Sequence, residues 1–120
     1  MKFCHVTIYV KNLEESLHCY RDILDLPIQR QFSPGPNVNI AFLGDGETEI
    51  ELIDDPRKND VSIGADISLG FEVNSVQEAQ EFLRKNNITP GEIQQPSPQV
   101  KFFFVSDPNG VTIQFSENEK

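Results

Sequence analysis

The chain has 120 residues, 38% of them hydrophobic and 24% charged, which is typical of one globular domain and excludes a disordered chain. The formal net charge of −9 repels phosphate backbones and anionic lipids, so we expect neither nucleic acid nor a membrane as a partner. No apolar run reaches membrane-spanning length and no signal-peptide pattern opens the chain, which predicts a cytoplasmic location.

The first half of the chain predicts a strand, a helix and three further strands. Apolar residues alternate over residues 3–10, as in a half-buried strand. The next segment, "NLEESLHCYRDIL", has apolar residues at helical spacing, and Asn12 with Glu15 forms a capping box at its start. Turns rich in glycine and proline then separate three predicted strands, at residues 28–33, 38–44 and 48–54.

The second half predicts the same order of elements. Residues 66–73 have the alternation of a strand, and Ser75 with Glu78 forms a second capping box before the helical segment "SVQEAQEFLRKNN". The turns "PSP" and "DPNG" separate the strands predicted after this helix, which are residues 91–95, 100–106 and 111–116.

The two halves form an internal repeat. At an offset of 63 residues, Val10 aligns with Val73 and Glu51 aligns with Gln114. We therefore predict an α+β fold built from two tandem βαβββ modules, related by a pseudo-two-fold, within a single domain that spans residues 1–120. The predicted modules cover about residues 1–54 and 66–117, and the polar segment 55–65 is the predicted linker.

Polar residues gather on one face of each predicted sheet. Side chains alternate across a strand, so the face that does not pack on the helix carries His5 and Thr7 in the first strand and Glu51 in the fourth. Ser68 and Gln114 fall at the matching positions of the second module. If each module curves into half of a cup, we expect the side chains of His5, Glu51, Ser68 and Gln114 to converge in one pocket.

Three motifs resemble the vicinal oxygen chelate superfamily, which includes glyoxalase I, bleomycin resistance proteins and extradiol dioxygenases. They are "CHVTIYVKNLEESLHCYRDILDLP", "EIELID" and "FFFVSDPNGVTIQF", and the resemblance covers the whole chain. Glyoxalase-like members hold a divalent metal at four positions, which correspond here to His5, Glu51, Ser68 and Gln114. Those members usually have a histidine where this chain has Ser68 and a glutamate, commonly a catalytic base, where it has Gln114.

The resemblance implies a glyoxalase-like, metal-dependent lyase or isomerase that acts on a small carbonyl or thiol-adduct substrate. The metal, Zn, Ni, Co or Mn, would be held by His5, Glu51 and Gln114, and Glu51 and Gln114 would be the catalytic residues. The resemblance also implies a homodimer, in which the site forms either within one chain or between two.

Two alternatives stay open. The first is a metal-free small-molecule binding protein, of the resistance or sequestration type, with the same fold. Its pocket, like that of the enzyme, would be lined by Thr7, Ser68, Phe42, Phe102 and Phe104, and Phe32 is a further candidate. The second, an extradiol dioxygenase, is less favoured, because such enzymes bind Fe(II) through two histidines and a carboxylate. The other histidine, His18, lies on the predicted first helix.

Other reactive or charged residues have structural interpretations. Cys4 and Cys19 have no metal-ligand spacing, and we predict two reduced thiols in the core. The acidic residues at 54–55 and 117–119 are interpreted as solvated strand ends, and Asp107 and Asn109 as turn residues. Arg30 and Lys101 are interpreted as surface charges, and the alternative is that they reach an anionic substrate at the pocket mouth.

Overall fold

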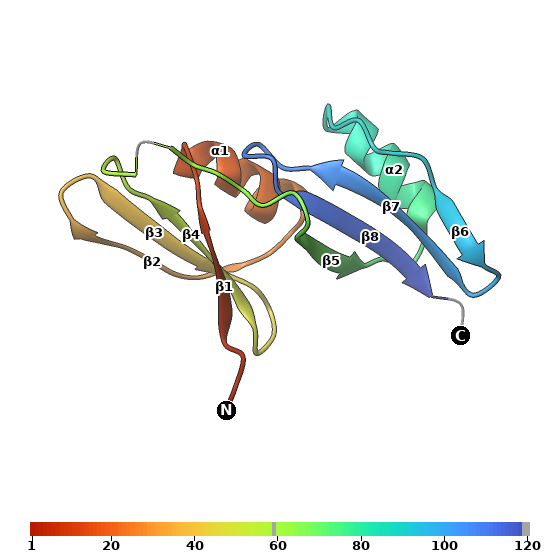
Figure 1. Cartoon of the computed structure of the whole chain (residues 1–120), viewed down its shortest axis with the longest axis horizontal. Coiled ribbons are helices and arrows are strands. Elements are labelled where there is room, and N and C mark those ends of the chain that lie inside the picture. The colour runs from red at the N-terminus through yellow and green to blue at the C-terminus, as the bar shows by residue number, and fades with distance from the viewer. Residues whose placement is uncertain (59, 119–120) are drawn as a thin grey trace. The chain divides into compact units, whose positions relative to one another are not determined.

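One order of elements occurs twice in the computed structural model. The structure describes residues 1–58 and 60–118, and Glu119, predicted to be solvated, lies outside them. The chain divides into two compact units, Met1–Ser62 and Ile63–Lys120, and each is described by itself. The first unit contains β1 (His5–Tyr9), α1 (Leu13–Leu17), the π-helical segment η1 (His18–Ile23), β2 (Ile28–Gly35), β3 (Val38–Leu43) and β4 (Glu49–Asp54) (Figure 1). The second contains β5 (Ser68–Glu72), α2 (Val76–Lys85), β6 (Gln94–Ser97), β7 (Val100–Ser106) and β8 (Thr112–Asn118).

Each unit contains one four-stranded sheet with the same topology. The strand order is β1-β4-β3-β2 in the first unit and β5-β8-β7-β6 in the second. In both sheets the first strand runs parallel to the last one, and the other neighbours are antiparallel. The register repeats as well, because Thr7 lies beside Glu51 and Gly70 lies beside Gln114, each 63 residues further along. The predicted α+β fold with two similar halves is thus confirmed.

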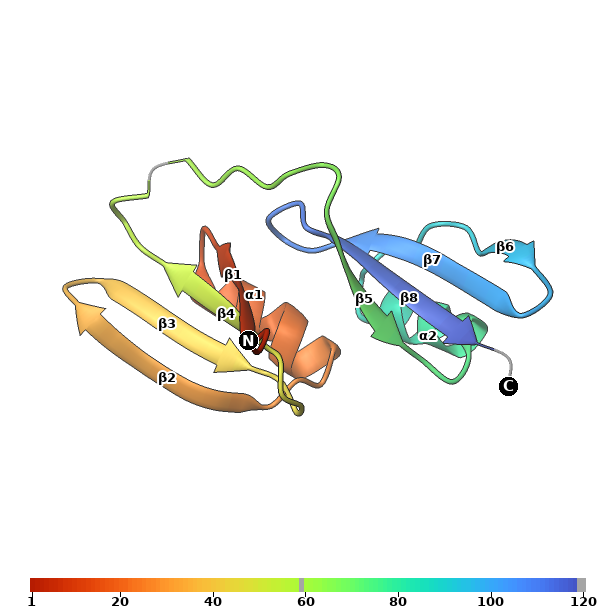
Figure 2. The ribbon, with the colours of Figure 1, turned by 60° about the horizontal axis from the view of Figure 1, so that its bottom comes forward.

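Helices cover one face of each sheet, and this face forms the core. Figure 2 shows α1 against the sheet of the first unit and α2 against the sheet of the second. In the first unit the buried apolar side chains include Ile8, Val10, Leu17, Ala41, Leu43 and Leu52. In the second they include Val76, Leu83, Phe103, Val105, Ile113 and Phe115. We call the opposite side of each sheet its open face.

Both predicted N-cap residues, Asn12 and Ser75, accept a hydrogen bond at the helix starts. The Asn12 side-chain oxygen accepts a hydrogen bond from the Glu15 N–H at 3.0 Å, and the Ser75 hydroxyl accepts one from the Glu78 N–H at 3.2 Å. Each bond satisfies one of the N–H groups that a helix start leaves unpaired, which stabilises the fold by about 1 kcal/mol.

Two acidic residues predicted to be solvated have a structural role instead. Asp54, at the end of β4, accepts a hydrogen bond from the Leu13 N–H at 3.0 Å, at the first residue of α1. Glu117, 63 residues later in β8, accepts one from the Val76 N–H at 2.8 Å, at the first residue of α2. The repeat therefore includes a carboxylate that joins the last strand of each unit to its helix, which corrects the prediction.

The first helix and the first cysteine also differ from the prediction. The α-helix ends at Leu17, and the chain continues to Ile23 as the π-helical segment η1, where the predicted helix is continuous. The prediction of two core thiols is right for Cys19, which is buried, and wrong for Cys4, which is exposed. The reason is that β1 begins only at His5, so Cys4 precedes the part of the strand that packs under the helix.

Among the helices that the structure describes, none has the length and apolar composition that crossing a bilayer requires.

Candidate functional site

The open face of the first unit brings three of the predicted site residues together. The Thr7 hydroxyl donates a hydrogen bond to Oε1 of Glu51 at 2.6 Å. The same oxygen lies 3.5 Å from Nε2 of His5. The Glu51 side chain is 14% exposed and that of His5 is 39% exposed, so the carboxylate lies deeper than the imidazole.

Strand geometry explains this arrangement. Thr7 of β1 and Glu51 of β4 are neighbours in a parallel ladder, so their side chains project from the same face. His5 precedes Thr7 by two residues and therefore shares that face. The prediction from alternation rests on the same geometry.

Phe42 forms the aromatic centre of this face. It lies beside Glu51 in the β3–β4 ladder, and the His5 ring meets it edge-on, with ring centroids 5.5 Å apart. The Phe32 ring stacks on it at 6.3 Å. The Arg30 guanidinium lies 4.0 Å above the Phe42 ring, and these neighbours leave Phe42 only 6% exposed.

Sequence reasoning favoured a surface charge for Arg30 over a place at the pocket mouth, and did not predict its contact with Phe42. Arg30 pairs with Phe42 across the β2–β3 hairpin, and its guanidinium also lies 3.8 Å from Oε1 of Glu49. The predicted surface charge is therefore a half-exposed cation stacked over an aromatic ring on the open face. The hairpin pairing was the available signal, because it places residue 30 next to residue 42 once the register is known.

Cys4 is a second residue of the open-face cluster that the sequence did not indicate, as a neighbour of the His5 ring. Its sulfur lies 3.4 Å from Nδ1 of His5, while the other ring nitrogen faces Glu51. The His5 ring is thus held between a thiol on one side and a carboxylate on the other, and these contacts orient it on the open face.

The open face of the second unit carries the other predicted residues. Gln114 lies beside Gly70 in the β5–β8 ladder and beside Phe104 in the β7–β8 ladder. Phe102 meets Phe104 edge-on, with ring centroids 5.6 Å apart, while the intervening Phe103 is fully buried in the core. Ser68 begins β5, two residues before Gly70, and so shares this face.

The two open faces differ where they correspond. The Thr7–Glu51 pair of the first unit is a Gly70–Gln114 pair in the second, so the second unit has neither the hydroxyl donor nor the carboxylate. A Cβ atom added to Gly70 would lie 3.8 Å from Oε1 of Gln114, an ordinary contact, so space does not require the glycine.

The residues described here do not by themselves fit the implied metal. Within residues 1–58 and 60–118, no three histidine, cysteine, aspartate or glutamate side chains lie close enough together to hold a metal ion. The first unit provides one imidazole, His5, and one carboxylate, Glu51, whereas a catalytic zinc ion usually has three protein ligands. One Glu51 oxygen also already accepts the Thr7 hydroxyl. A third ligand from Gln114, and a catalytic role for it, stay predictions.

Comparison with known proteins agrees with the fold. The chain matches, over residues 2–115, the family model described as the Glyoxalase/Bleomycin resistance protein/Dioxygenase superfamily. No curated protein gives a significant match.

Several solved structures have the same fold. Glyoxalase I of Leishmania major is 23% identical, with a TM-score of 0.81 over 98% of this chain and 86% of that one. A glyoxalase family protein from Enterococcus faecalis is 22% identical, with a TM-score of 0.77 over 97% of both chains. The antibiotic binding protein TnmS3 from Streptomyces sp. CB03234 is 16% identical, with a TM-score of 0.79 over 99% of this chain and 97% of that one. The fold and the family match together show that this chain belongs to the Glyoxalase/Bleomycin resistance protein/Dioxygenase superfamily.

Proposed function

We propose that the protein binds a small molecule on the open face of its first unit, and that Glu51 and His5 contact this ligand directly instead of holding a catalytic metal. The observation that carries the proposal is the 2.6 Å hydrogen bond from Thr7 to Glu51, in a cluster with a single imidazole. A carboxylate oriented by a hydroxyl is a preformed acceptor for a donor group on a ligand.

The aromatic residues beside Glu51 support a ligand with a planar part. Phe32 is 45% exposed and stacks on Phe42, so one of its ring faces is accessible. The Arg30 side chain, whose guanidinium lies over Phe42, is 58% exposed, and planar guanidinium groups stack on aromatic rings. The expected ligand therefore combines a hydrogen-bond donor for Glu51 with a flat group for Phe32 and Arg30. The similarity in fold to an antibiotic binding protein is consistent with this role.

The metal-dependent lyase is the second candidate. The approach of His5 Nε2 to Glu51 Oε1, at 3.5 Å, favours it, because these are the two family ligand positions that the chain retains. It would require Gln114 as a third ligand for Zn, Ni, Co or Mn, and its substrate would be a small carbonyl or thiol adduct. A dioxygenase is disfavoured, since His18 lies in η1 beside Asp22, at 3.4 Å, and not on the open face.

Metal binding separates the two candidates. The protein is dialysed against chelator, analysed for metal, and titrated with Ni, Co and Zn by calorimetry. We expect no stoichiometric uptake and no turnover of the hemithioacetal of methylglyoxal and glutathione. Stoichiometric uptake that is lost in Glu51→Gln but kept in Glu49→Gln would overturn the proposal in favour of the lyase. Glu49 is the matched control, because it occupies the same strand and face and contacts Arg30.

Ligand binding is tested on the same variants. Bleomycin, named in the family description, is the first probe, followed by other planar antibiotics with amine or hydroxyl groups. We expect Glu51→Gln to weaken the binding of any such ligand by about tenfold, the effect of losing one charge-assisted hydrogen bond. A ligand whose affinity is the same for Glu51→Gln and the original chain does not use the proposed site.

A gain-of-function variant tests the loss of the metal site. Ser68→His combined with Gln114→Glu restores the residues that glyoxalase-like members usually have at those positions. If the four positions converge as predicted, the double variant should bind Ni or Zn more tightly than the original chain. The homodimer and the cytoplasmic location also stay predictions, and light scattering of the purified protein tests the first.

A further inference from the structure

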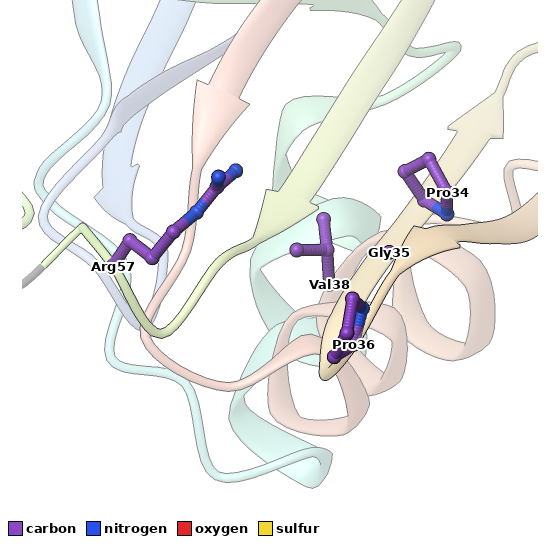
Figure 3. A pocket seen from close by; sticks show the side chains of 5 residues that line it. All are labelled: Pro34, Gly35, Pro36, Val38 and Arg57. Atoms are coloured by element: carbon purple, nitrogen blue, oxygen red, sulfur yellow. The ribbon is translucent and has the colours of Figure 1, made fainter.

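The first unit contains a cavity at the end of the sheet, away from the Glu51 cluster. Its volume is about 360 Å³, and it lies between the tip of the β2–β3 hairpin and the segment that follows β4. Figure 3 shows Arg57 extending from that segment toward the hairpin, on the opposite side of the cavity. The cavity is lined by Pro34, Gly35, Pro36, Val38 and Arg57.

The charged wall of the cavity is the Arg57 guanidinium, which hydrogen bonds to Asp55 hold in place. Asp55 accepts hydrogen bonds from Nε of Arg57 at 3.0 Å and from Nη2 at 2.8 Å, and its Oδ1 also accepts the Arg57 backbone N–H at 2.9 Å. The Asp55 side chain is 12% exposed, whereas that of Arg57 is 82% exposed. The carboxylate thus lies under the guanidinium, and the guanidinium is the group presented to solvent.

Arg57 keeps donors for a second partner. A guanidinium has five N–H donors, and the two side-chain bonds to Asp55 use two of them, so three remain. Its planar fork matches the geometry of carboxylate and phosphate groups. The neighbouring Lys58 places its ammonium 5.6 Å from the centre of the Tyr9 ring, which adds a second cation to this end of an otherwise acidic chain.

The opposite wall is apolar and stiff. Pro34 and Pro36 have fixed rings, and Val38 is a buried β-branched residue that occupies few rotamers. The volume falls in the range of small-molecule sites, roughly 300 to 1,000 Å³. An apolar wall that faces one oriented guanidinium suits a ligand with an apolar body and a single anionic group.

We propose that this cavity binds a small organic anion, with a carboxylate or phosphate on Arg57 and an apolar group against Pro34, Pro36 and Val38. It is separate from the Glu51 cluster, since Val38 and Phe42 lie four residues apart on β3, or about 13 Å along the strand. The proposal does not depend on the proposed function.

Amide chemical shifts in an NMR titration test the site. Benzoate, phenyl phosphate and neutral benzyl alcohol are added in turn at constant ionic strength, and the amides of Gly35, Val38 and Arg57 are followed. We expect saturable shifts at these amides with the two anions, and an affinity for benzyl alcohol about tenfold weaker. The two anions show which oxyanion the site prefers.

Two variants with matched controls separate charge from cavity shape. Arg57→Gln should weaken benzoate binding by about tenfold, whereas Arg21→Gln should not, although Arg21 is also ion-paired, to Asp22 at 2.8 Å. Gly35→Leu should weaken binding because it adds bulk at the cavity wall that Gly35 lines, where a Cβ meets no atom within 4 Å. Gly46→Leu enters equally open space outside the lining residues and should have no effect.

Three results would overturn the proposal. An affinity for benzyl alcohol equal to that for benzoate, or binding unchanged in Arg57→Gln, would show that the guanidinium does not select an anion. Binding unchanged in Gly35→Leu would show that the anion lies outside the cavity. No saturable shift with either anion would show that no site exists. Gly35 has open space around it, so Gly35→Leu is expected to fold. Arg57→Gln loses the hydrogen bonds to Asp55, so the amide spectrum of this variant is first compared with that of the original chain to verify its fold.

Discussion

The carboxylate that joins β4 to α1 provides a sharp test of the repeat. Replacing Asp54 by alanine removes the acceptor of the Leu13 N–H, at 3.0 Å. This N–H belongs to the first turn of the helix, where N–H groups have no partner within the helix itself. Hydrogen bonds to charged groups contribute about 1.5–3 kcal/mol, and a negative charge near a helix N-terminus is favourable. Because Asp54 is only half-buried, water can bind the freed Leu13 N–H in the variant and offset part of the lost stability.

We therefore expect Asp54→Ala to lower the free energy of unfolding by about 1–2 kcal/mol, and Asp54→Asn, which keeps an oxygen acceptor, by about 0.5 kcal/mol. Urea unfolding followed by circular dichroism measures both, with Asp45→Ala, in an exposed turn, as the control. Glu117→Ala should have a similar cost, because Glu117 accepts the Val76 N–H at 2.8 Å in the second unit. A loss below about 0.3 kcal/mol for Asp54→Ala would refute the reasoning.

Three further predictions follow from the exposure of the two cysteines, the backbone angle of Asn37 and the Asp55–Arg57 pair. Cys4 should react rapidly with a thiol reagent in the folded protein and Cys19 only on unfolding, since the first is exposed and the second buried; equal rates would contradict the fold. Asn37 has a φ of 63°, so Asn37→Ala should cost about 1 kcal/mol in urea unfolding and Asn37→Gly almost nothing. The Arg57 side-chain hydrogen bond, and then its backbone N–H, lower the pKa of Asp55. This pair stabilises the fold above the ordinary carboxyl pKa and stops doing so as the pH falls through the lowered value. Arg57→Gln should therefore raise the pKa of Asp55 in a carboxyl NMR titration. The variant should be less stable than the original chain at neutral pH, and this difference should disappear in acid.

Local patterns in the sequence predicted the fold and part of the candidate site. The N-cap hydrogen bonds of Asn12 and Ser75 join residues three apart in the sequence, so the helix starts could be predicted directly. Strand alternation placed His5, Thr7 and Glu51 on one face. The internal repeat predicted two similar sheets, and the structure has β1 and β4 in one and β5 and β8 in the other. These features need only the period of a strand and an offset along the chain.

Tertiary structure alone decided which partners the polar residues have. Asp54 and Leu13 are 41 residues apart, and their hydrogen bond depends on where β4 ends relative to the helix. Arg30 became part of the open face because the hairpin register places it over Phe42. Arg57 lines a cavity because the segment after β4 lies near the tip of the β2–β3 hairpin, about twenty residues earlier in the chain. Periodicity indicates the face on which a side chain lies, whereas its neighbours depend on the register between distant segments, and that register is set by packing of the whole unit.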